Sequence, residues 1–298
     1  MKKSLLLFTL ILLISCNPPN SGSPVSGNPI SGNPAFVHNP PYEEFADADK
    51  PVHETLTYDD NGTDQSYKLM IPWNYDKSHN ADRDYPLVVS FSGTPFIVGD
   101  DDEMKGYPCF FLETGRSSWC QDLVAQLVED YRIDTNRIYL TGFSAGGSGS
   151  YPFASDLESR HNLVVAGIVR CAGGSNTALS DAIAGKTSVW YHVGLADGYD
   201  FGYGSDQENY SPDPDDPLRK SNIAYDFVKN LTSSSGAIET VQTETISGYP
   251  RTTTTLNLAG VEIFKRSHYE GMGHSPSPVY GDSKVLEWLF NQNLLNRE

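Results

Sequence analysis

From about residue 50 onward, short apolar segments alternate with turn-forming residues, as in a folded domain. Residues 53–60 and 65–75 predict two strands, which are joined by a turn at Asn61 and Gly62. Residues 85–93, YPLVVSFSG, form a continuous apolar run that ends in small residues. Such a run is typical of a strand that is buried on both faces of a sheet.

Helical spacing then alternates with further apolar runs. Leu123, Leu127 and Tyr131 recur at helical spacing within residues 119–134. The other predicted elements are a strand at 137–141, a helix after 144, a strand at 163–171, a short helix near 177–183, a strand at 188–194, a helix near 218–231, a hairpin after Pro250, a strand ending at 269 and a helix at 281–292. This order predicts an α/β domain over residues 49–298, with a mainly parallel sheet and helices on both faces.

The first residues follow a different pattern, in which Lys2 and Lys3 precede an apolar run at residues 5–14. A run of about ten residues is too short for a spanning helix, which takes roughly 20. Residues 1–15 are therefore predicted to be a cleaved secretory signal. The exit LISC resembles a bacterial lipobox, so we expect a lipid on Cys16 that anchors the chain to a membrane, with its body outside the cytoplasm. An ordinary signal peptide with an unmodified cysteine is the alternative.

Residues 16–48 are rich in Pro, Gly, Ser and Asn, and they contain three copies of a five-residue Ser-Gly-x-Pro unit. A segment with so few bulky apolar residues cannot bury a core, and it is predicted to be a flexible tether. A recognition segment for a partner is the alternative.

The formal net charge of −17 repels phosphate backbones and anionic lipid headgroups. Nucleic acid is therefore not expected as a partner. The lipid at the N-terminus, rather than the surface of the domain, would hold the protein at a membrane.

Apart from Cys16, the chain contains Cys109, Cys120 and Cys171. An oxidising compartment would allow two of them to pair. A disulfide between Cys109 and Cys120 closes a short loop and is the first expectation, and a bond between Cys120 and Cys171 is the alternative. None of them lies in a Cys-x-x-Cys pattern, so neither metal nor redox chemistry is expected.

The segment Gly142-Phe143-Ser144-Ala145-Gly146 places a serine directly after a predicted strand and directly before a predicted helix. A nucleophile elbow requires this strand, turn and helix context, and small residues on both sides of the serine let the turn close. A glycine-rich turn without a catalytic role is the alternative, because the five-residue pattern also occurs by chance.

A serine nucleophile needs a base, and the base needs an orienting acid. The elbow is followed along the chain by the acid and then by the histidine. Asp197 comes just past the predicted strand at 188–194, and His274 lies in a glycine-flanked loop before the last helix. Both positions fit this order. The competing residues are Asp200 for the acid and His161, His192 and His268 for the base.

Four segments, PLVVSFSG, RIYLTGFSAGG, VWYHVGLAD and GMGHS followed by VLEWLF, resemble one group of enzymes. They are similar to the feruloyl and acetylxylan esterases and the related polyhydroxybutyrate depolymerase-like proteins of the α/β-hydrolase fold, over residues 67–290. The resemblance implies that Ser144 is the nucleophile, Asp197 the orienting acid and His274 the base. It also implies a monomeric serine esterase that needs no cofactor and removes acetyl or feruloyl groups from plant polysaccharide.

One segment departs from that pattern. The family usually has His-Gly after the strand that supplies the oxyanion hole, whereas this chain has Phe91-Ser92-Gly93-Thr94. Backbone N–H groups stabilise an oxyanion. We therefore expect the N–H of Ala145 and one from Gly93 or Thr94 to form the hole.

Three other functions compete: a polyhydroxybutyrate depolymerase-like esterase, a serine peptidase, and an inactive homologue that binds carbohydrate. Prolyl-oligopeptidase-like peptidases share the order of the three residues but bring a large extra domain. The altered turn at Ser92 and Gly93 is the argument for an inactive homologue. Asp213, Asp215 and Asp216 lack the spacing of a calcium loop, so no metal is expected.

Overall fold

The computed structural model describes residues 52–73, 75–76, 81–91, 107–173, 186–197, 229 and 236–297, all within one compact unit, Ala35–Glu298. Over these ranges the strands are β1 (Val52–Asp60), β2 (Thr63–Ile71), β3 (Tyr85–Phe91), β4 (Phe110–Thr114), β5 (Ile133–Phe143), β6 (Gly167–Cys171), β7 (Ser188–Gly194), β8 (Ile238–Ile246), β9 (Tyr249–Leu258) and β10 (Val261–Tyr269). The helices are α2 (Trp119–Asp130), α3 (Ala145–His161), α5 (Ser277–Tyr280), α6 (Ser283–Phe290) and a 3-10 helix at Leu294–Arg297.

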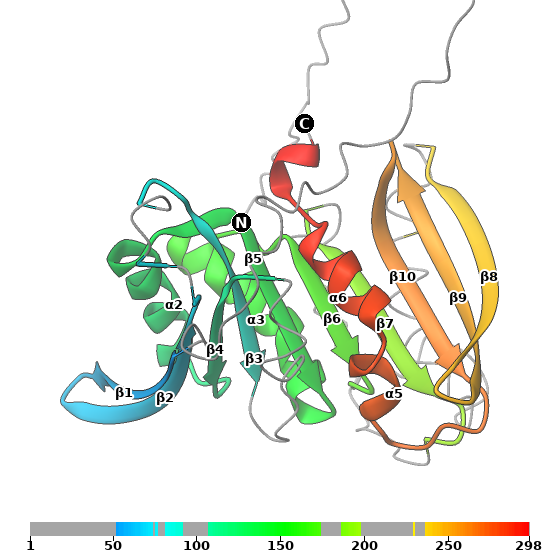
Figure 1. The fold of residues 1–298 in the computed structure, drawn as a ribbon, viewed down its shortest axis with the longest axis horizontal. Coiled ribbons are helices and arrows are strands. Elements are labelled where there is room, and N and C mark those ends of the chain that lie inside the picture. Colours follow the sequence, from blue (N-terminus) through cyan, green and yellow to red (C-terminus); the bar gives the residue numbers. More distant parts are fainter. Residues whose placement is uncertain are drawn as a thin grey trace, which may run out of the picture. The chain divides into compact units, whose positions relative to one another are not determined.

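These strands form one ten-stranded sheet in the order β1-β2-β4-β3-β5-β6-β7-β10-β9-β8 (Figure 1). The central strands from β4 to β10 are parallel, and an antiparallel pair extends the sheet at each edge. Every residue of β3 is buried, as its continuous apolar run predicted. The mainly parallel α/β sheet expected from the sequence is therefore confirmed.

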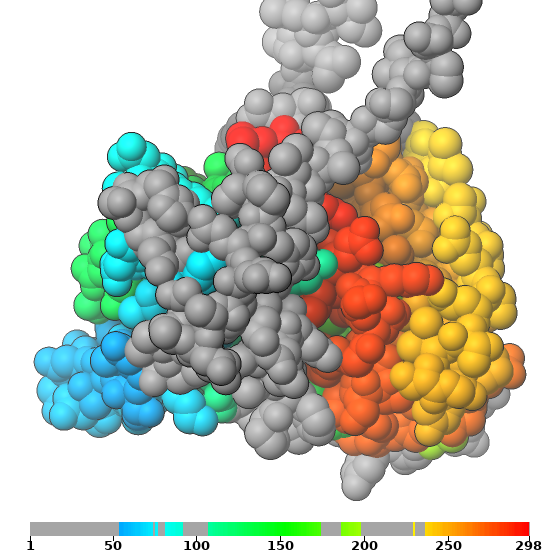
Figure 2. Space-filling view, viewed as in Figure 1, coloured from blue at the N-terminus to red at the C-terminus, as the bar shows by residue number. Residues whose placement is uncertain are grey.

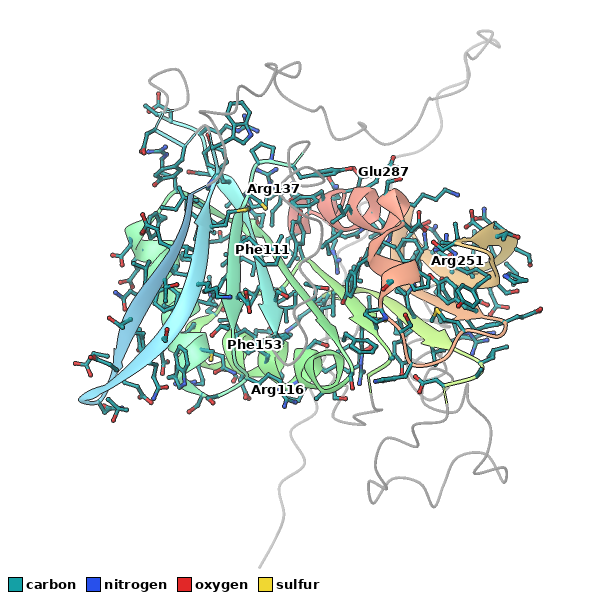
Figure 3. All side chains as sticks on the ribbon, turned by 60° about the horizontal axis from the view of Figure 1, so that its bottom comes forward. Phe111, Arg116, Arg137, Phe153, Arg251 and Glu287 are labelled. Atoms are coloured by element: carbon teal, nitrogen blue, oxygen red, sulfur yellow. The ribbon has the colours of Figure 1, made fainter. Side chains whose placement is uncertain are left out.

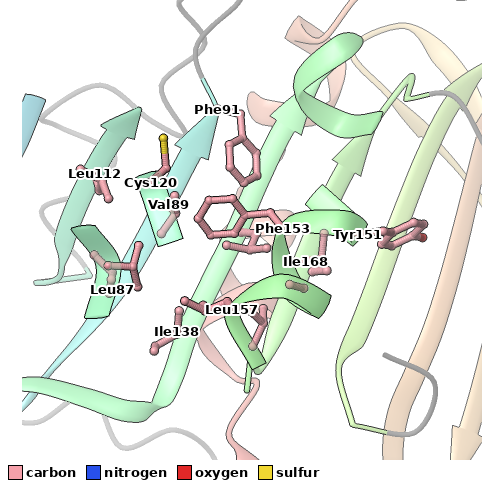
Figure 4. Packing of buried hydrophobic residues seen from close by; sticks show 14 of the residues in the cluster. Leu87, Val89, Phe91, Leu112, Cys120, Ile138, Tyr151, Phe153, Leu157 and Ile168 are labelled. Atoms are coloured by element: carbon pink, nitrogen blue, oxygen red, sulfur yellow. The ribbon is translucent and has the colours of Figure 1, made fainter. Parts of the chain in front are cut away.

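Helices cover both faces of the sheet. Successive residues of a strand point to opposite sides, so a strand that is buried along its whole length contributes side chains to a core on each face. On β3, Leu87, Val89 and Phe91 join a core that includes α2 and α3, whereas Val88 joins a core that includes α5 and α6. Phe91 and Phe153 meet edge to face with their ring centroids 4.9 Å apart (Figure 4). Figure 1 shows α6 in front of the sheet.

Two described strands, β4 and β8, were not predicted from the sequence. Most side chains of β8 are exposed, Ile238 and Val241 among them. The strand therefore lacks the alternation of apolar and polar residues that a half-buried strand shows in the sequence. The hairpin expected after Pro250 is confirmed in part: β9 pairs on one side with β8 and on the other with β10. β8, β9 and β10 form an antiparallel wing, which joins the parallel strands where β10 pairs with β7.

Ion pairs attach the wing to α6. The guanidinium of Arg251 on β9 is buried and donates to Asp282 Oδ2 at 2.7 Å and to Glu244 Oε1 at 2.6 Å. Lys284 on α6 also donates to Glu244 on β8. Figure 2 shows the red C-terminal segment next to the yellow one on this face. The hydrogen bonds from Arg251 and Lys284 lower the pKa of Glu244. Two elements far apart in the sequence are therefore held together by charged groups.

The expected disulfide between Cys109 and Cys120 is wrong, because all three described cysteines are free, buried thiols. Cys120 belongs to the core that includes α2 and α3, whereas Cys109 and Cys171 belong to the core on the other face of the sheet. The sheet separates Cys120 from both possible partners. Burial raises the pKa of all three thiols, which makes them poor nucleophiles.

Several predictions from the sequence lie outside the described residues. These are the signal at 1–15, the lipid on Cys16, the tether at 16–48, the helix near 177–183, the acidic loop with Asp213, Asp215 and Asp216, and most of the helix near 218–231. They stay predictions. Within the described ranges, none of the helices has the length and apolar character needed to cross a membrane.

Candidate active site

Ser144 lies at the sharp turn between β5 and α3, as the elbow motif predicted. Its backbone has φ 56° and ψ −119°, a strained conformation for a residue with a Cβ. The N–H of Ser144 donates to the carbonyl of Cys171 at 2.9 Å, which ties the turn to the end of β6. A Cβ on Gly142 would lie 2.5 Å from the backbone carbon of Gly146. The turn therefore closes only because this position is glycine.

Asp197 and His274, which are 77 residues apart in the chain, form a hydrogen bond. His274 Nδ1 lies 2.8 Å from Asp197 Oδ2, and the two side chains are 17% and 5% exposed. The ring of His274 packs against Phe143, with 4.5 Å between the ring centroids. Because Phe143 directly precedes Ser144, the structure brings the three residues predicted from the sequence to one edge of the sheet.

Backbone hydrogen bonds lock the loop that carries Asp197 to the loop that carries His274. Leu195 N–H donates to the carbonyl of Tyr269, and Ala196 N–H donates to the carbonyl of Met272, each at 2.9 Å. A Cβ on Gly194 would lie 2.1 Å from the carbonyl oxygen of Met272. The two loops can approach so closely only because Gly194 has no side chain.

Replacing Gly194 with alanine should therefore separate the two loops. We expect a loss of about 1–3 kcal/mol in the free energy of unfolding, typical of overpacking, together with a lower rate of ester hydrolysis. Chemical denaturation and an assay with p-nitrophenyl acetate would measure the two effects.

Gly273→Ala is the matched control, because a Cβ there would meet its nearest neighbour, the carbonyl oxygen of Ala196, at 3.8 Å, an ordinary contact. Equal stability and activity of the Gly194→Ala and Gly273→Ala variants would contradict the importance of the close approach.

The competing histidines lie in other environments. His192 is fully buried, its Nδ1 lies 3.0 Å from the hydroxyl of Tyr269, and burial holds its pKa well below the ordinary value. His268 lies on β10, and burial lowers its pKa as well. His161 Nε2 lies 2.9 Å from Asp122 Oδ1. The competing acid Asp200 lies outside the described residues.

The expected oxyanion donors are described only in part. Ala145 is exposed and begins α3, where the backbone N–H has no acceptor within the helix. Gly93 and Thr94 lie in 92–106, outside the described residues.

Sequence reasoning missed one residue beside the elbow. Arg116, in the turn between β4 and α2, donates through Nη1 to the carbonyl of Ala145 at 2.7 Å. The one signal that could have pointed to it is Gly149, a glycine inside a helix.

Among the residues that the structure describes, no cluster of three or more His, Cys, Asp or Glu side chains could hold a metal ion. The arrangement at the elbow instead combines a serine at a strained turn, a histidine bonded to a nearly buried carboxylate, and a helix N-terminus. Such an arrangement can perform nucleophilic catalysis on an acyl group.

No family model matches the sequence. Over 60 residues the chain is 33% identical to a bifunctional acetylxylan esterase/xylanase of Neocallimastix patriciarum. That match spans 20% of this chain and 8% of the relative, so it concerns a small part of a much longer protein.

Several solved esterases share the fold. A thermostable esterase matches with a TM-score of 0.54 and 20% identity, over 83% of this chain and 64% of its own length. The feruloyl esterase module from Clostridium thermocellum, a serine-to-alanine mutant complexed with sinapinate, matches with a TM-score of 0.51 and 12% identity, over 84% of this chain and 94% of its own. A ferulic acid esterase matches with a TM-score of 0.51 and 10% identity, over 81% and 98%. The chain thus has the α/β-hydrolase fold of these esterases, as expected.

Proposed function

We propose that this protein is a serine carboxylic ester hydrolase that works through Ser144, Asp197 and His274. The observation that carries the proposal is the 2.8 Å contact between His274 Nδ1 and Asp197 Oδ2. It occurs beside Phe143, the residue before a serine whose backbone is strained as a nucleophile elbow requires. A histidine that only filled space would not need a nearly buried carboxylate as its partner.

In the proposed mechanism, His274 takes the proton of Ser144 as the hydroxyl attacks the ester carbonyl carbon. Asp197 accepts a hydrogen bond from the Nδ1–H of His274, which keeps that proton on Nδ1, leaves Nε2 as the basic nitrogen and stabilises the imidazolium that forms. The N–H of Ala145, with a second donor expected from Gly93 or Thr94, stabilises the oxyanion. His274 then protonates the leaving alcohol, and water, activated by the same histidine, releases the acid from the acyl-enzyme.

We propose acetyl or feruloyl esters of plant polysaccharide as the substrates. The support is the family resemblance of the motifs around the three residues, together with the short match to an acetylxylan esterase/xylanase. The shared fold with a feruloyl esterase module is consistent with this choice.

Labelling with a fluorophosphonate, followed by mass spectrometry of the peptides, tests the chemistry. We expect an adduct on Ser144, because this serine directly follows Phe143, against which the ring of His274 packs. A panel of acetylated xylan, methyl ferulate and a hydroxybutyrate ester then tests the substrate. Lack of an adduct on Ser144 would contradict the esterase, and preferred cleavage of the hydroxybutyrate ester would contradict the proposed substrate.

A further inference from the structure

A glycine occupies the first turns of α3 at position 149, although alanine would favour a helix there. The space that a Cβ would fill is occupied by Arg116. A Cβ on Gly149 would lie 2.2 Å from Cδ and 3.0 Å from Cγ of that arginine. The glycine therefore gives the stem of Arg116 a path across the surface of α3, and in Figure 3 the label of Arg116 stands beside this helix.

The arginine reaches the residue after the nucleophile. Its Nη1 donates to the carbonyl of Ala145 at 2.7 Å, within the normal range for a charge-assisted hydrogen bond. The first turn of α3 has no acidic side chain with which the guanidinium could form an ion pair. Its contact in that turn is the carbonyl of Ala145. The N–H of the same residue is the expected oxyanion donor.

We infer that Arg116 is a positioning residue for the oxyanion hole, an inference that rests on the proposed esterase function. Ala145 is an exposed residue. The hydrogen bond from Arg116 holds the carbonyl of Ala145, and with it the orientation of the N–H on the other side of the same Cα. Gly149 contributes to this positioning because it leaves room for the side chain of Arg116.

A double-mutant cycle tests this inference without relying on one variant. Arg116→Ala removes the donor, whereas Gly149→Ala keeps the arginine but places a methyl group where its Cδ lies. We expect each variant to lower kcat by about 10-fold with little change in KM, because the effect of a misplaced donor appears in the transition state. The double variant should be no slower than Arg116→Ala, since a displaced arginine and an absent one are equivalent.

Stability separates positioning from a structural role. Alanine at position 149 favours the helix, so the Gly149→Ala variant should keep or raise its Tm while kcat falls. Arg160→Ala is the matched control, because this arginine lies on α3 and contacts Ser118 and Asp122 rather than Ala145. It should keep the wild-type kcat.

The rate of fluorophosphonate labelling provides a second readout, because the phosphoryl oxygen occupies the oxyanion site. We expect this rate to fall in the Arg116→Ala and Gly149→Ala variants together with kcat. Labelling at the wild-type rate in both would overturn the role of Arg116 and leave the esterase proposal intact. A wild-type protein that is not labelled at Ser144 would overturn the esterase proposal, and the inference with it.

Discussion

The Ser144→Ala variant is expected to hydrolyse p-nitrophenyl acetate with a kcat that is lower by about 10⁶-fold, as when other serine hydrolases lose their nucleophile. The reason is chemical: without the hydroxyl, His274 has no proton to accept and no acyl-enzyme can form. The variant should still bind the ester, so the loss should appear in kcat rather than in KM.

The loss of activity in Ser144→Ala identifies the nucleophile only if the variant is folded. Ser148→Ala makes the same change one turn along α3, where the hydroxyl donates to the carbonyl of Ser144, and it should keep kcat close to wild type. Ser144→Gly should be equally inactive but no less stable than wild type, because glycine adopts the φ of 56° without strain. Substantial turnover by Ser144→Ala would show that another group is the nucleophile.

The elbow could be predicted from the sequence because its signals are local. A strand, a tight turn with small residues and a helix follow one another directly around Ser144, and each leaves a pattern in a short window. The chain order of Asp197 and His274 was a further constraint. Their hydrogen bond was not predictable in the same way, since it depends on how β7 and β10 pair across the sheet.

The failures share a physical cause. The disulfide was inferred from the short spacing of Cys109 and Cys120, but spacing does not show on which face of the sheet a side chain lies. The contact of Arg116 with Ala145 joins the turn before α2 to the first residue of α3, 29 residues further along the chain, and only the glycine at 149 hints at it. Contacts between elements follow from packing, and a one-dimensional pattern records them indirectly.

The buried network around Arg251 illustrates the same limit. A basic residue in the run that follows Pro250 gives no sign in the sequence that it will be buried. In the structure its charge is balanced by Asp282 on one side and Glu244 on the other, as a buried guanidinium requires. The partners come from β8 and from the N-cap of α6, so the position of the arginine depends on how the wing packs against that helix.

Replacing Asp197 with asparagine is expected to lower kcat by about 10⁴-fold at neutral pH while the fold and KM change little. The amide has nearly the same shape as the carboxylate, so the side chain, which is 5% exposed, still fits its place. It carries no charge, however, and it can present its NH₂ group to Nδ1 of His274. That arrangement favours the tautomer whose proton is on Nε2, and this nitrogen can then no longer accept the proton of Ser144.

The control for charge loss is Asp156→Asn, at an exposed position on α3. It removes the same charge without touching His274, so its kcat should equal that of wild type. Combining Asp197→Asn with Ser144→Ala should give no further loss than Ser144→Ala alone, because residues that act as one unit are not additive. If Asp197→Asn stayed within about tenfold of wild type, far from the 10⁴-fold loss that the wrong tautomer causes, then another acid would have to orient His274. The 2.8 Å contact would in that case be structural rather than catalytic.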